Sequence, residues 1–216
     1  YLKKMTDRVL RKATTLKYKD GDEPFIEFES FNTHELLVFT NKCQVYKCKV
    51  SSFEDTKSAQ LGSYLPTDLD MDADESVTWV IDPGDYKADV LFAFENGRVA
   101  RVALSGYVTK TNRKRLKNAI YGGSKLLFAT VLTEERDLAL VSSDYRLVNF
   151  NTSLLKTKTT NSTQGVQAFT VKGTRTVTMV GTAEEFLGEK APLDKFRAAS
   201  LPSSGAPMKE TDMKSL

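Results

Sequence analysis

The chain has 216 residues, 40% of them hydrophobic and 10% aromatic, a composition typical of a globular protein rather than a disordered one. Its longest apolar run, residues 126–132, is far shorter than the roughly 18 residues that span a bilayer, which argues against a membrane protein. The formal net charge of +3 hides a strong asymmetry, because residues 1–19 and 102–133 are basic whereas residues 50–95 are acidic.

The first five residues, Tyr1 to Met5, fit the second strand of a β-hairpin, with Leu2 aligned to Val45 and Val99. We therefore expect the sequence to begin in the middle of a repeated unit and to be a fragment of a longer protein. Residues 25–28 are the next strand candidate, and they lie upstream of the first complete hairpin.

Three hairpins with one pattern follow, at residues 36–48, 90–102 and 138–150. Each has an apolar strand, a short polar turn and a second strand, and the Asn96-Gly97 turn is a strong hairpin signal. The period of roughly 50 residues favours the blades of a propeller-like β fold.

Further strand candidates precede the second and third hairpins, at residues 77–80 and 126–131, and a partial fourth set covers residues 166–171 and 177–180. The segments after the hairpins, including residues 105–123 and 152–165, carry much of the basic excess. Residues 188–216 are rich in Pro, Ser and Lys, which predicts an irregular C-terminal tail.

The sequence offers little for catalysis or for metal binding. Cys43 and Cys48 are expected to point to opposite faces of a strand, and His34 is the single histidine, so a zinc site lacks ligands. The acidic residues 68–75 have some calcium-loop spacing, but they lack the glycine and the final glutamate of such a loop. We predict no catalytic residue, no metal and no cofactor.

Several of these stretches resemble the C-terminal domain of the A subunit of bacterial type IIA topoisomerases, the family of DNA gyrase and topoisomerase IV. They are Tyr1 to Met5, Leu36 to Val50 (LLVFTNKCQVYKCKV) and Ser142 to Lys172 with its Gly165-Val166. The likeness runs from residue 1 to about residue 181 and is more specific in the order of the stretches than in their identity.

The resemblance implies an all-β fold, a β-pinwheel of about four four-stranded blades over residues 1–187, followed by the tail at residues 188–216. It also implies a non-catalytic domain that binds and bends duplex DNA on a basic outer rim and presents it to the strand-passage gate. The implied partners are the rest of the A subunit, which would in turn connect this domain to the ATPase B subunit. The implied location is the bacterial cytoplasm, near the nucleoid and away from membranes. The catalytic tyrosine of such a topoisomerase would lie outside this chain.

One departure from the family concerns the box rich in Gln, Arg and Gly that follows the first-blade strand in gyrase. The matching stretch, Arg11 to Lys17, keeps part of the charge but has neither glycine nor glutamine. The sequence is therefore nearer to topoisomerase IV or to a diverged gyrase.

Phosphate contacts need Lys and Arg on loops that recur once per repeat. The predicted DNA-binding residues are Lys3, Lys4, Arg8, Arg11, Lys12, Lys17, Lys110, Arg113, Lys114, Arg115, Lys117, Lys156 and Lys158.

Two alternatives stay open at this point. Each basic run could be a solvated loop, or the rim could dock an acidic protein partner. Lys47 and Arg101, at matching strand positions, could pair with neighbouring carboxylates instead of contacting DNA.

Overall fold

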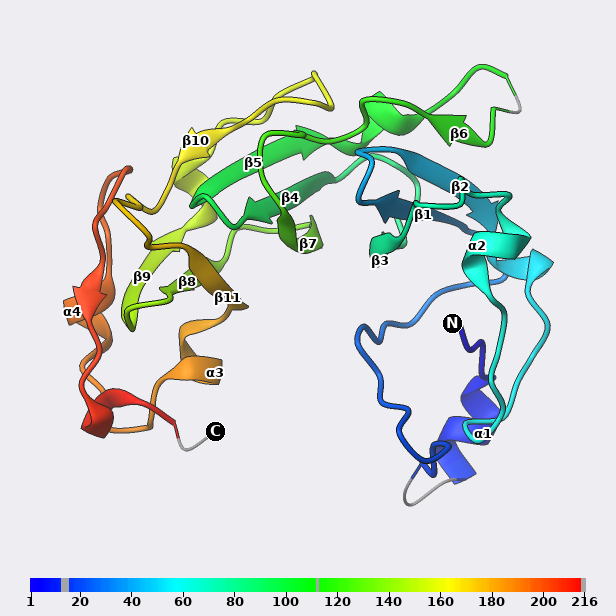
Figure 1. Ribbon diagram of the computed structural model, residues 1–216, viewed down its shortest axis with the longest axis horizontal. Helices are drawn as coiled ribbons and strands as arrows, with labels where there is room; N and C mark the ends of the chain where they lie inside the picture. The colour runs from blue at the N-terminus through cyan, green and yellow to red at the C-terminus, as the bar shows by residue number, and fades with distance from the viewer. Residues whose placement is uncertain (13–15, 112, 215–216) are drawn as a thin grey trace. The chain divides into compact units, whose positions relative to one another are not determined.

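The computed structural model describes residues 1–12, 16–111 and 113–214, and their regular secondary structure is mainly β-strand (Figure 1). The chain forms two compact units. Unit 1 contains Tyr1–Asp85 and Lys110–Lys117, and unit 2 contains Tyr86–Thr109 and Asn118–Leu216.

The described residues contain three four-stranded antiparallel sheets, which confirms the all-β fold class. The first sheet lies in unit 1 and has the order β3 (Val77–Ile81), β1 (Glu35–Thr40), β2 (Val45–Lys49), β6 (Arg115–Leu116). The second sheet lies in unit 2 and has the order β7 (Leu126–Leu132), β4 (Asp89–Phe94), β5 (Arg98–Ala103), β10 (Val166–Gln167). The third sheet, also in unit 2, has the order β11 (Val177–Gly181), β8 (Asp137–Ser142), β9 (Arg146–Asn151), β12 (Ala206–Pro207).

The three predicted hairpins are confirmed as β1–β2, β4–β5 and β8–β9. Their turns share one geometry, because Cys43, Gly97 and Tyr145 occupy equivalent positions with φ of 56°, 78° and 55°. A left-handed residue after a tight turn produces the bulge typical of three-residue hairpin loops. Gly97 is required there, since a Cβ would lie 2.2 Å from the carbonyl oxygen of Phe169.

In each sheet the strand that pairs with the first hairpin strand is called the innermost strand; these are β3, β7 and β11. The strand candidates at residues 77–80 and 126–131 are confirmed as β3 and β7, and each pairs with the hairpin before it in the chain. Residues 25–28 form no strand. The partial fourth set is divided in the same way, because β10 joins the second sheet and β11 the third.

The outermost strands, β6, β10 and β12, form the opposite edge of each sheet, and each comes later in the chain than the other three strands of its sheet. Each of β6, β10 and β12 pairs with the second strand of a preceding hairpin, at Val45, Val99 and Leu147 respectively. Gly165 and Gly205, both with positive φ, stand immediately before β10 and β12. A Cβ on Gly165 would lie 2.1 Å from the carbonyl oxygen of Val99, so glycine lets the outer strand approach closely.

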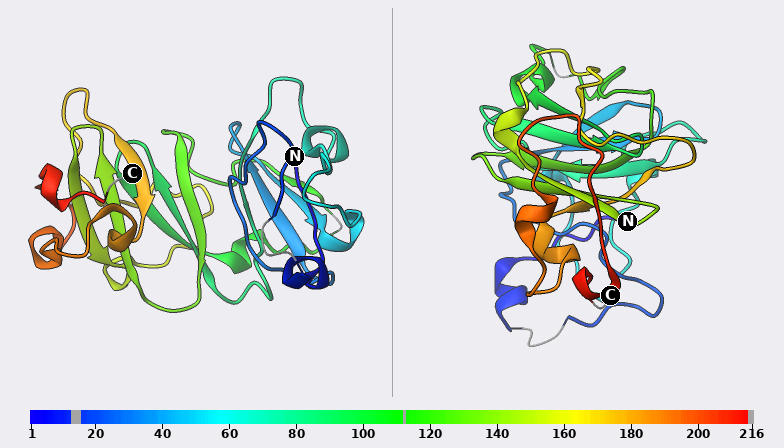
Figure 2. Two further views of the ribbon diagram at one scale, coloured as in Figure 1. Left: turned by 90° about the horizontal axis from the view of Figure 1, so that it is seen from below. Right: turned by 90° about the vertical axis from the view of Figure 1, so that its left-hand side faces the viewer.

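The helices are short: α1 (Asp7–Lys12), α2 (Leu65–Asp68), α3 (Ala183–Phe186) and α4 (Leu193–Phe196). Thr182 and Glu185 cap α3 with reciprocal hydrogen bonds to the backbone. Both α3 and α4 lie along the third sheet (Figure 2), where Leu187 and Phe196 pack against Val141 and Leu147.

The segment predicted as a C-terminal tail is therefore part of the packed structure. Phe196 and Met208 are buried, and β12 completes the third sheet. The boundary at residue 188 stays a prediction, since composition suggested it and contacts do not mark it.

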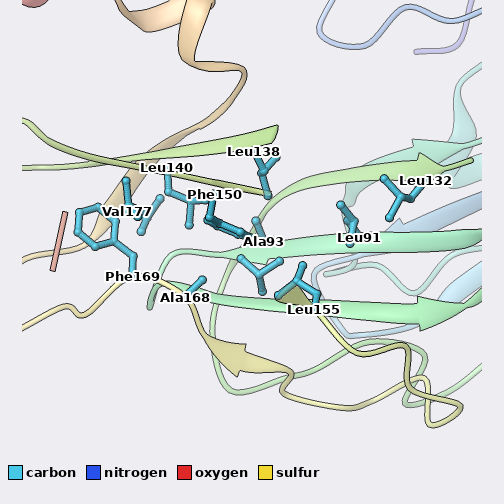
Figure 3. Packing of buried hydrophobic residues seen from close by; sticks show 12 residues of the cluster. Leu91, Ala93, Leu132, Leu138, Leu140, Phe150, Leu155, Ala168, Phe169 and Val177 are labelled. Atoms are coloured by element: carbon cyan, nitrogen blue, oxygen red, sulfur yellow. The ribbon is translucent and has the colours of Figure 1, made fainter. Parts of the chain in front are cut away.

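The core of unit 2 lies between the second and third sheets (Figure 3). Leu91 and Ala93 of β4 contribute to the same cluster as Leu140 of β8 and Phe150 of β9, and Phe169 is fully buried among them. A smaller cluster in unit 1 contains Leu36, Val38, Tyr46 and Phe53, with Leu2 packed against it. Burial of these apolar side chains is the main stabilising contribution to both units.

Within the described residues, no helix is both long and apolar enough to cross a membrane.

Candidate nucleic-acid interface

The most basic loop of the molecule, residues 108–117, is fixed to the outer edge of the first sheet. Its last residues form β6, which pairs with β2 through Val45–Leu116 and Tyr46–Arg115. One residue earlier, the Lys47 amide donates to the Lys114 carbonyl oxygen at 2.7 Å. The backbone of this loop is therefore held by the sheet over its C-terminal half.

Arg115, one of the predicted DNA-binding residues, holds the loop against the rest of unit 1. Its guanidinium donates to Asp72 at 2.7 Å and to the Gln44 side chain at 2.6 Å, and it lies 5.4 Å from the centre of the Tyr46 ring. The Asp72 carboxylate raises the pKa of Arg115, and Arg115 lowers the pKa of Asp72. The positive charge is thus neutralised locally.

Behind Arg115, the buried carboxylate of Glu75 organises a polar network. It accepts hydrogen bonds from the hydroxyl of Thr40, from the Gln44 amide at 2.9 Å and from the Tyr46 hydroxyl at 2.7 Å. Burial raises the pKa of Tyr46 to about 12, with a further contribution from Glu75. Burial by itself would raise the pKa of Glu75, but the hydrogen bonds from Thr40 and Tyr46 outweigh it, so its pKa is lowered.

The acidic stretch 68–75 is therefore largely engaged with unit 1 itself. Asp72 binds Arg115, Asp74 binds Lys42, and Glu75 is buried. No group of His, Cys, Asp or Glu suited to hold a metal ion occurs among the residues that the structure describes. Through Asp72, the stretch helps to position the basic loop.

The remaining cations of the loop are exposed and uncompensated. Lys110, Arg113, Lys114 and Lys117 are all exposed and make no ion pair with any described residue. Arg113 follows a tight backbone contact, in which its amide donates to the Thr111 carbonyl oxygen at 2.6 Å. Asn112 lies outside the described residues.

A second loop, in unit 2, occupies the equivalent place beside the second sheet. The Lys158 amide donates to the Arg101 carbonyl oxygen at 2.8 Å, and the Ala103 amide donates to the Lys158 carbonyl oxygen at 2.9 Å. Lys156 and Lys158 are exposed and, within the described part of the chain, have no carboxylate partner. Loop 108–117 beside β2 and this loop beside β5 therefore both present free cations next to the second strand of a hairpin.

Lys47 and Arg101, at matching positions of β2 and β5, pair with neighbouring carboxylates, which is the alternative to DNA contact that the sequence left open for them. The ammonium of the buried Lys47 lies 3.5 Å from Glu35, and Arg101 binds Asp89 at 2.6 Å and Glu135 at 2.7 Å. These pairs tie each hairpin together at the base of the loop.

The N-terminal basic run is largely neutralised. Lys3 pairs with Asp22, Lys4 pairs with Asp55 at 3.1 Å, and Arg11 pairs with Asp7 at 2.6 Å.

Two other residues of that run, Arg8 and Lys17, are exposed and unpaired within the described residues. The side chain of Lys12 lies outside the described part. The segment beside Lys4 carries Glu54 and Asp55 with Lys57, whereas the segment at the equivalent bridge of the second sheet carries Lys156 and Lys158.

Sequence reasoning missed the residues that position the basic loop. Gln44, Asp72 and Glu75 contact Arg115 or each other, although Gln44 is 71 positions from Arg115 and Asp72 is 43. No local pattern signals such contacts.

Comparison with known proteins connects this geometry to a defined group. No protein-family model matches the sequence. The chain is 30% identical over 123 residues to the A subunit of DNA topoisomerase 4 from Staphylococcus epidermidis, covering 55% of this chain and 15% of that protein. It is 21% identical over 201 residues to the A subunit of DNA gyrase from the same species, covering 85% of this chain and 22% of that protein.

Among solved structures, the C-terminal domain of DNA topoisomerase IV superposes with a TM-score of 0.75 at 20% identity over 99% of this chain and 72% of that one. The E. coli ParC C-terminal domain gives a TM-score of 0.67 at 14% identity, over 93% of this chain and 87% of that one. The expected resemblance to the C-terminal domains of these topoisomerases is confirmed.

The β-pinwheel fold is confirmed by these neighbours together with the three four-stranded sheets. Proteins of both the gyrase and the topoisomerase IV type match, so the comparisons do not choose between them. The chain spans less than a quarter of the length of these curated relatives.

Proposed function

We propose that this chain binds duplex DNA through phosphate contacts, largely independently of base sequence, and bends it along the outer strands of its sheets. The observation that carries the proposal is the pair of equivalent loops, 108–117 and 156–158, whose exposed cations are free of carboxylate partners among the described residues. Most other cations that the sequence singled out are neutralised by ion pairs.

Binding of this kind requires cations placed along the path of the DNA backbone, and it does not require groups that recognise individual bases. Each phosphate neutralised by Lys or Arg releases condensed counterions, so affinity is high at low salt and falls steeply as salt rises. Bending a site of 20–30 base pairs by 40–90° costs about 1–6 kcal/mol, which additional backbone contacts offset. Four exposed side chains without an ion pair to any described residue can each supply one such contact: Lys110, Arg113, Lys114 and Lys117.

The revised set of DNA-contacting residues follows from burial and pairing. We retain Arg8, Lys17, Lys110, Arg113, Lys114, Lys117, Lys156 and Lys158, and we assign Lys3, Lys4, Arg11 and Arg115 to structural ion pairs. Lys12 stays a prediction from the sequence.

We further propose that the chain acts without catalysis of its own, as part of a topoisomerase A subunit that works together with the ATPase B subunit. Its similarity to C-terminal domains of topoisomerase IV and gyrase A supports this role. In that setting the bound duplex would be presented to a strand-passage gate elsewhere in the protein. The bacterial origin of the curated relatives supports a cytoplasmic, nucleoid-associated location.

The decisive experiment is a titration of fluorescent duplexes of 10 to about 50 base pairs, followed by anisotropy at several salt concentrations. We expect affinity to rise with duplex length and to decrease linearly in log–log form with salt. The variant Arg113→Glu/Lys114→Glu should lose more than tenfold in affinity, and its salt slope should be shallower by about 2 because two phosphate contacts are lost.

Lys190→Glu is the matched control, because Lys190 is equally exposed but lies far along the chain from both loops. It should bind like the unaltered chain. Equal affinities for the control and the Arg113→Glu/Lys114→Glu variant would contradict the proposed site. Binding that does not depend on duplex length, with preference for an acidic protein over DNA, would favour the alternative of an acidic partner.

A further inference from the structure

Two equivalent arginines of unit 2 lie on the outer edges of its sheets, at the end that is next to the hairpin turn. Arg98 is the first residue of β5 and lies opposite Gln167 of β10. Arg146 is the first residue of β9 and lies opposite Pro207 of β12. Neither arginine is among the predicted DNA-binding residues, and the residue opposite each of them carries no charge.

The hairpin turns hold the backbone of both arginines in the same way. The amide of Arg98 donates to the Asn96 side chain at 3.2 Å, and the amide of Arg146 donates to the Ser142 hydroxyl at 3.1 Å. Both acceptors belong to the turn or to the last residue before it. Each arginine side chain therefore starts from a position that its own hairpin fixes.

The guanidinium of Arg146 keeps its charge although it is hydrogen-bonded. It donates to the carbonyl oxygens of Ser204 at 2.9 Å and of Gly205 at 2.6 Å, which uses two of its five N–H groups. The carboxylate of the same turn, Asp144, is bound by Arg175 at 2.6 Å. Arg146 is thus an oriented cation without a carboxylate partner in the described part of the chain.

The first sheet has a cation at the same point, on the other strand of the outer pair. Lys117 follows Leu116, the partner of Val45. It therefore lies opposite Gln44, the residue equivalent to Arg98. Lys117 is exposed and Arg98 is partly exposed, and neither makes an ion pair with any residue that the structure describes. Each of the three sheets thus carries one free cation at the turn end of its outer edge.

These turn-end cations are separated along the strands from the loop cations at the other end of the edge. In the second sheet, Lys158 bridges to Val102, four residues from Arg98, so the two backbone positions are about 13 Å apart. In the first sheet, Lys114 precedes Lys117 by three residues, a distance of about 10 Å. The major groove of B-DNA is about 12 Å wide. The two sets of cations can therefore reach the phosphate backbones on both sides of one groove.

We propose that Lys117, Arg98 and Arg146 form a second line of phosphate contacts, so that the first and second sheets each hold both backbones of a duplex across one groove. This proposal rests on the proposed function, and it assigns the preference for a duplex over a single strand to a defined set of residues. A single strand has one backbone, and the loop cations are sufficient to bind it. The third sheet contributes to the turn-end line alone, because ion pairs neutralise its loop cations.

Anisotropy titrations with a duplex of about 30 base pairs and with an oligothymidine of the same length separate the two lines. Arg98→Gln/Arg146→Gln removes both turn-end charges of unit 2. We expect roughly tenfold weaker duplex binding, a salt slope shallower by about 2, and oligothymidine affinity within about twofold of the unaltered chain. Arg98→Lys/Arg146→Lys should retain the duplex affinity, because a phosphate contact needs mainly the charge.

Lys125→Gln/Lys190→Gln is the matched control, because it removes the same charge from exposed residues outside the outer strand pairs. Lys125 also lies at the turn end of the second sheet, but beside the innermost strand, where its carbonyl oxygen accepts from the Glu95 amide at 3.0 Å. The duplex affinity of this control should stay within about twofold of the unaltered chain.

A second variant covers the case in which loss of the Arg146 hydrogen bonds lowers the Tm. Arg98→Gln/Lys117→Gln removes two turn-end cations that make no ion pair with a described residue. It should show the same selective loss of duplex binding with an unchanged Tm.

Equal duplex affinities for the turn-end variants and their control, while Lys156→Glu/Lys158→Glu still binds more weakly, would overturn the second line and leave the proposed function standing. Equal losses for the duplex and the oligothymidine would also overturn it, because the turn-end line would then not distinguish the two. If the loop variant binds the duplex as well as the unaltered chain does, the proposed function fails, and this inference fails with it.

Discussion

Two loops that hold the same place in different sheets make opposite use of their basic residues. Loop 108–117 runs into β6 of the first sheet, and residues 192–205 run into β12 of the third. In the first loop, Arg113 and Lys114 are exposed without a carboxylate partner among the described residues. In the second, Lys195 binds Asp212 at 2.9 Å and Arg197 binds Asp137 at 2.6 Å.

This contrast shows that the number of basic residues in a loop does not set its attraction for a polyanion. A cation that already faces a carboxylate at ion-pair distance contributes little potential beyond that pair. Asp137 is 60 positions from Arg197, so this neutralisation is invisible in the local sequence. Loop 108–117 differs in this respect. Asp72 pairs with Arg115, and the other basic residues of the loop have no carboxylate partner among the described residues.

The largest expected effect is the loss of stability when Glu75, the centre of the polar network behind loop 108–117, is removed. Glu75→Ala leaves Thr40, Gln44 and Tyr46 without their shared buried acceptor, and we expect the free energy of unfolding to fall by roughly 3 kcal/mol. Urea denaturation of this variant measures the loss. Glu54→Ala, at an exposed carboxylate, is the control and should change the midpoint little.

A more moderate change is expected from the equivalent loop of the second sheet. Lys156→Glu/Lys158→Glu should weaken duplex binding and make the salt slope shallower by about 2, since both ammonium groups are exposed without a carboxylate partner in the described part of the chain. Lys195→Gln, in the third-sheet loop, should leave DNA affinity unchanged because Lys195 is already paired. Anisotropy titrations of the two variants side by side test the contrast between the loops, and equal losses would refute it.

In the third-sheet loop, residues 192–205, the ion pair between Lys195 and Asp212 should affect the stability of the protein at acid pH. The Lys209 amide and Lys195 lower the pKa of Asp212 in the folded state. The stabilisation from this carboxylate is therefore complete above the unfolded pKa of about 3.9 and is lost as pH falls through the lower folded pKa. Thermal melts between about pH 2 and pH 6 should show a shallower acid decline in Lys195→Gln, and an unchanged decline would contradict this role of Lys195.

The subtlest test separates the two kinds of arginine within loop 108–117. Arg113→Lys should bind duplexes almost as well as the unaltered chain, because a phosphate contact needs mainly the charge. Arg115→Lys should lower the urea midpoint, because lysine cannot reach both Asp72 and Gln44 with the guanidinium geometry. The reverse order of sensitivity would show that Arg115, and not Arg113, meets the ligand.

Local sequence was sufficient to specify the hairpins. Apolar strands and the tight turns at residues 41–43, 96–97 and 143–145 fix each of them, because these signals involve residues a few positions apart. The recurrence of that pattern, with its basic loops, was enough to predict the fold class and the resemblance. The cations of residues 110–117 and 156–158 were likewise identified as candidates before their surroundings were known.

Long-range packing was needed to settle which hairpin each remaining strand joins and which cations are free. Strand β7 precedes β8 by a short turn, yet it pairs with β4, since the preceding hairpin offers a free edge in register. Lys3, Lys4, Arg11 and Arg115 are basic in any interpretation of the sequence, but ion pairs neutralise them. Three of these four pairs join residues distant in the chain, and that proximity exists only after folding.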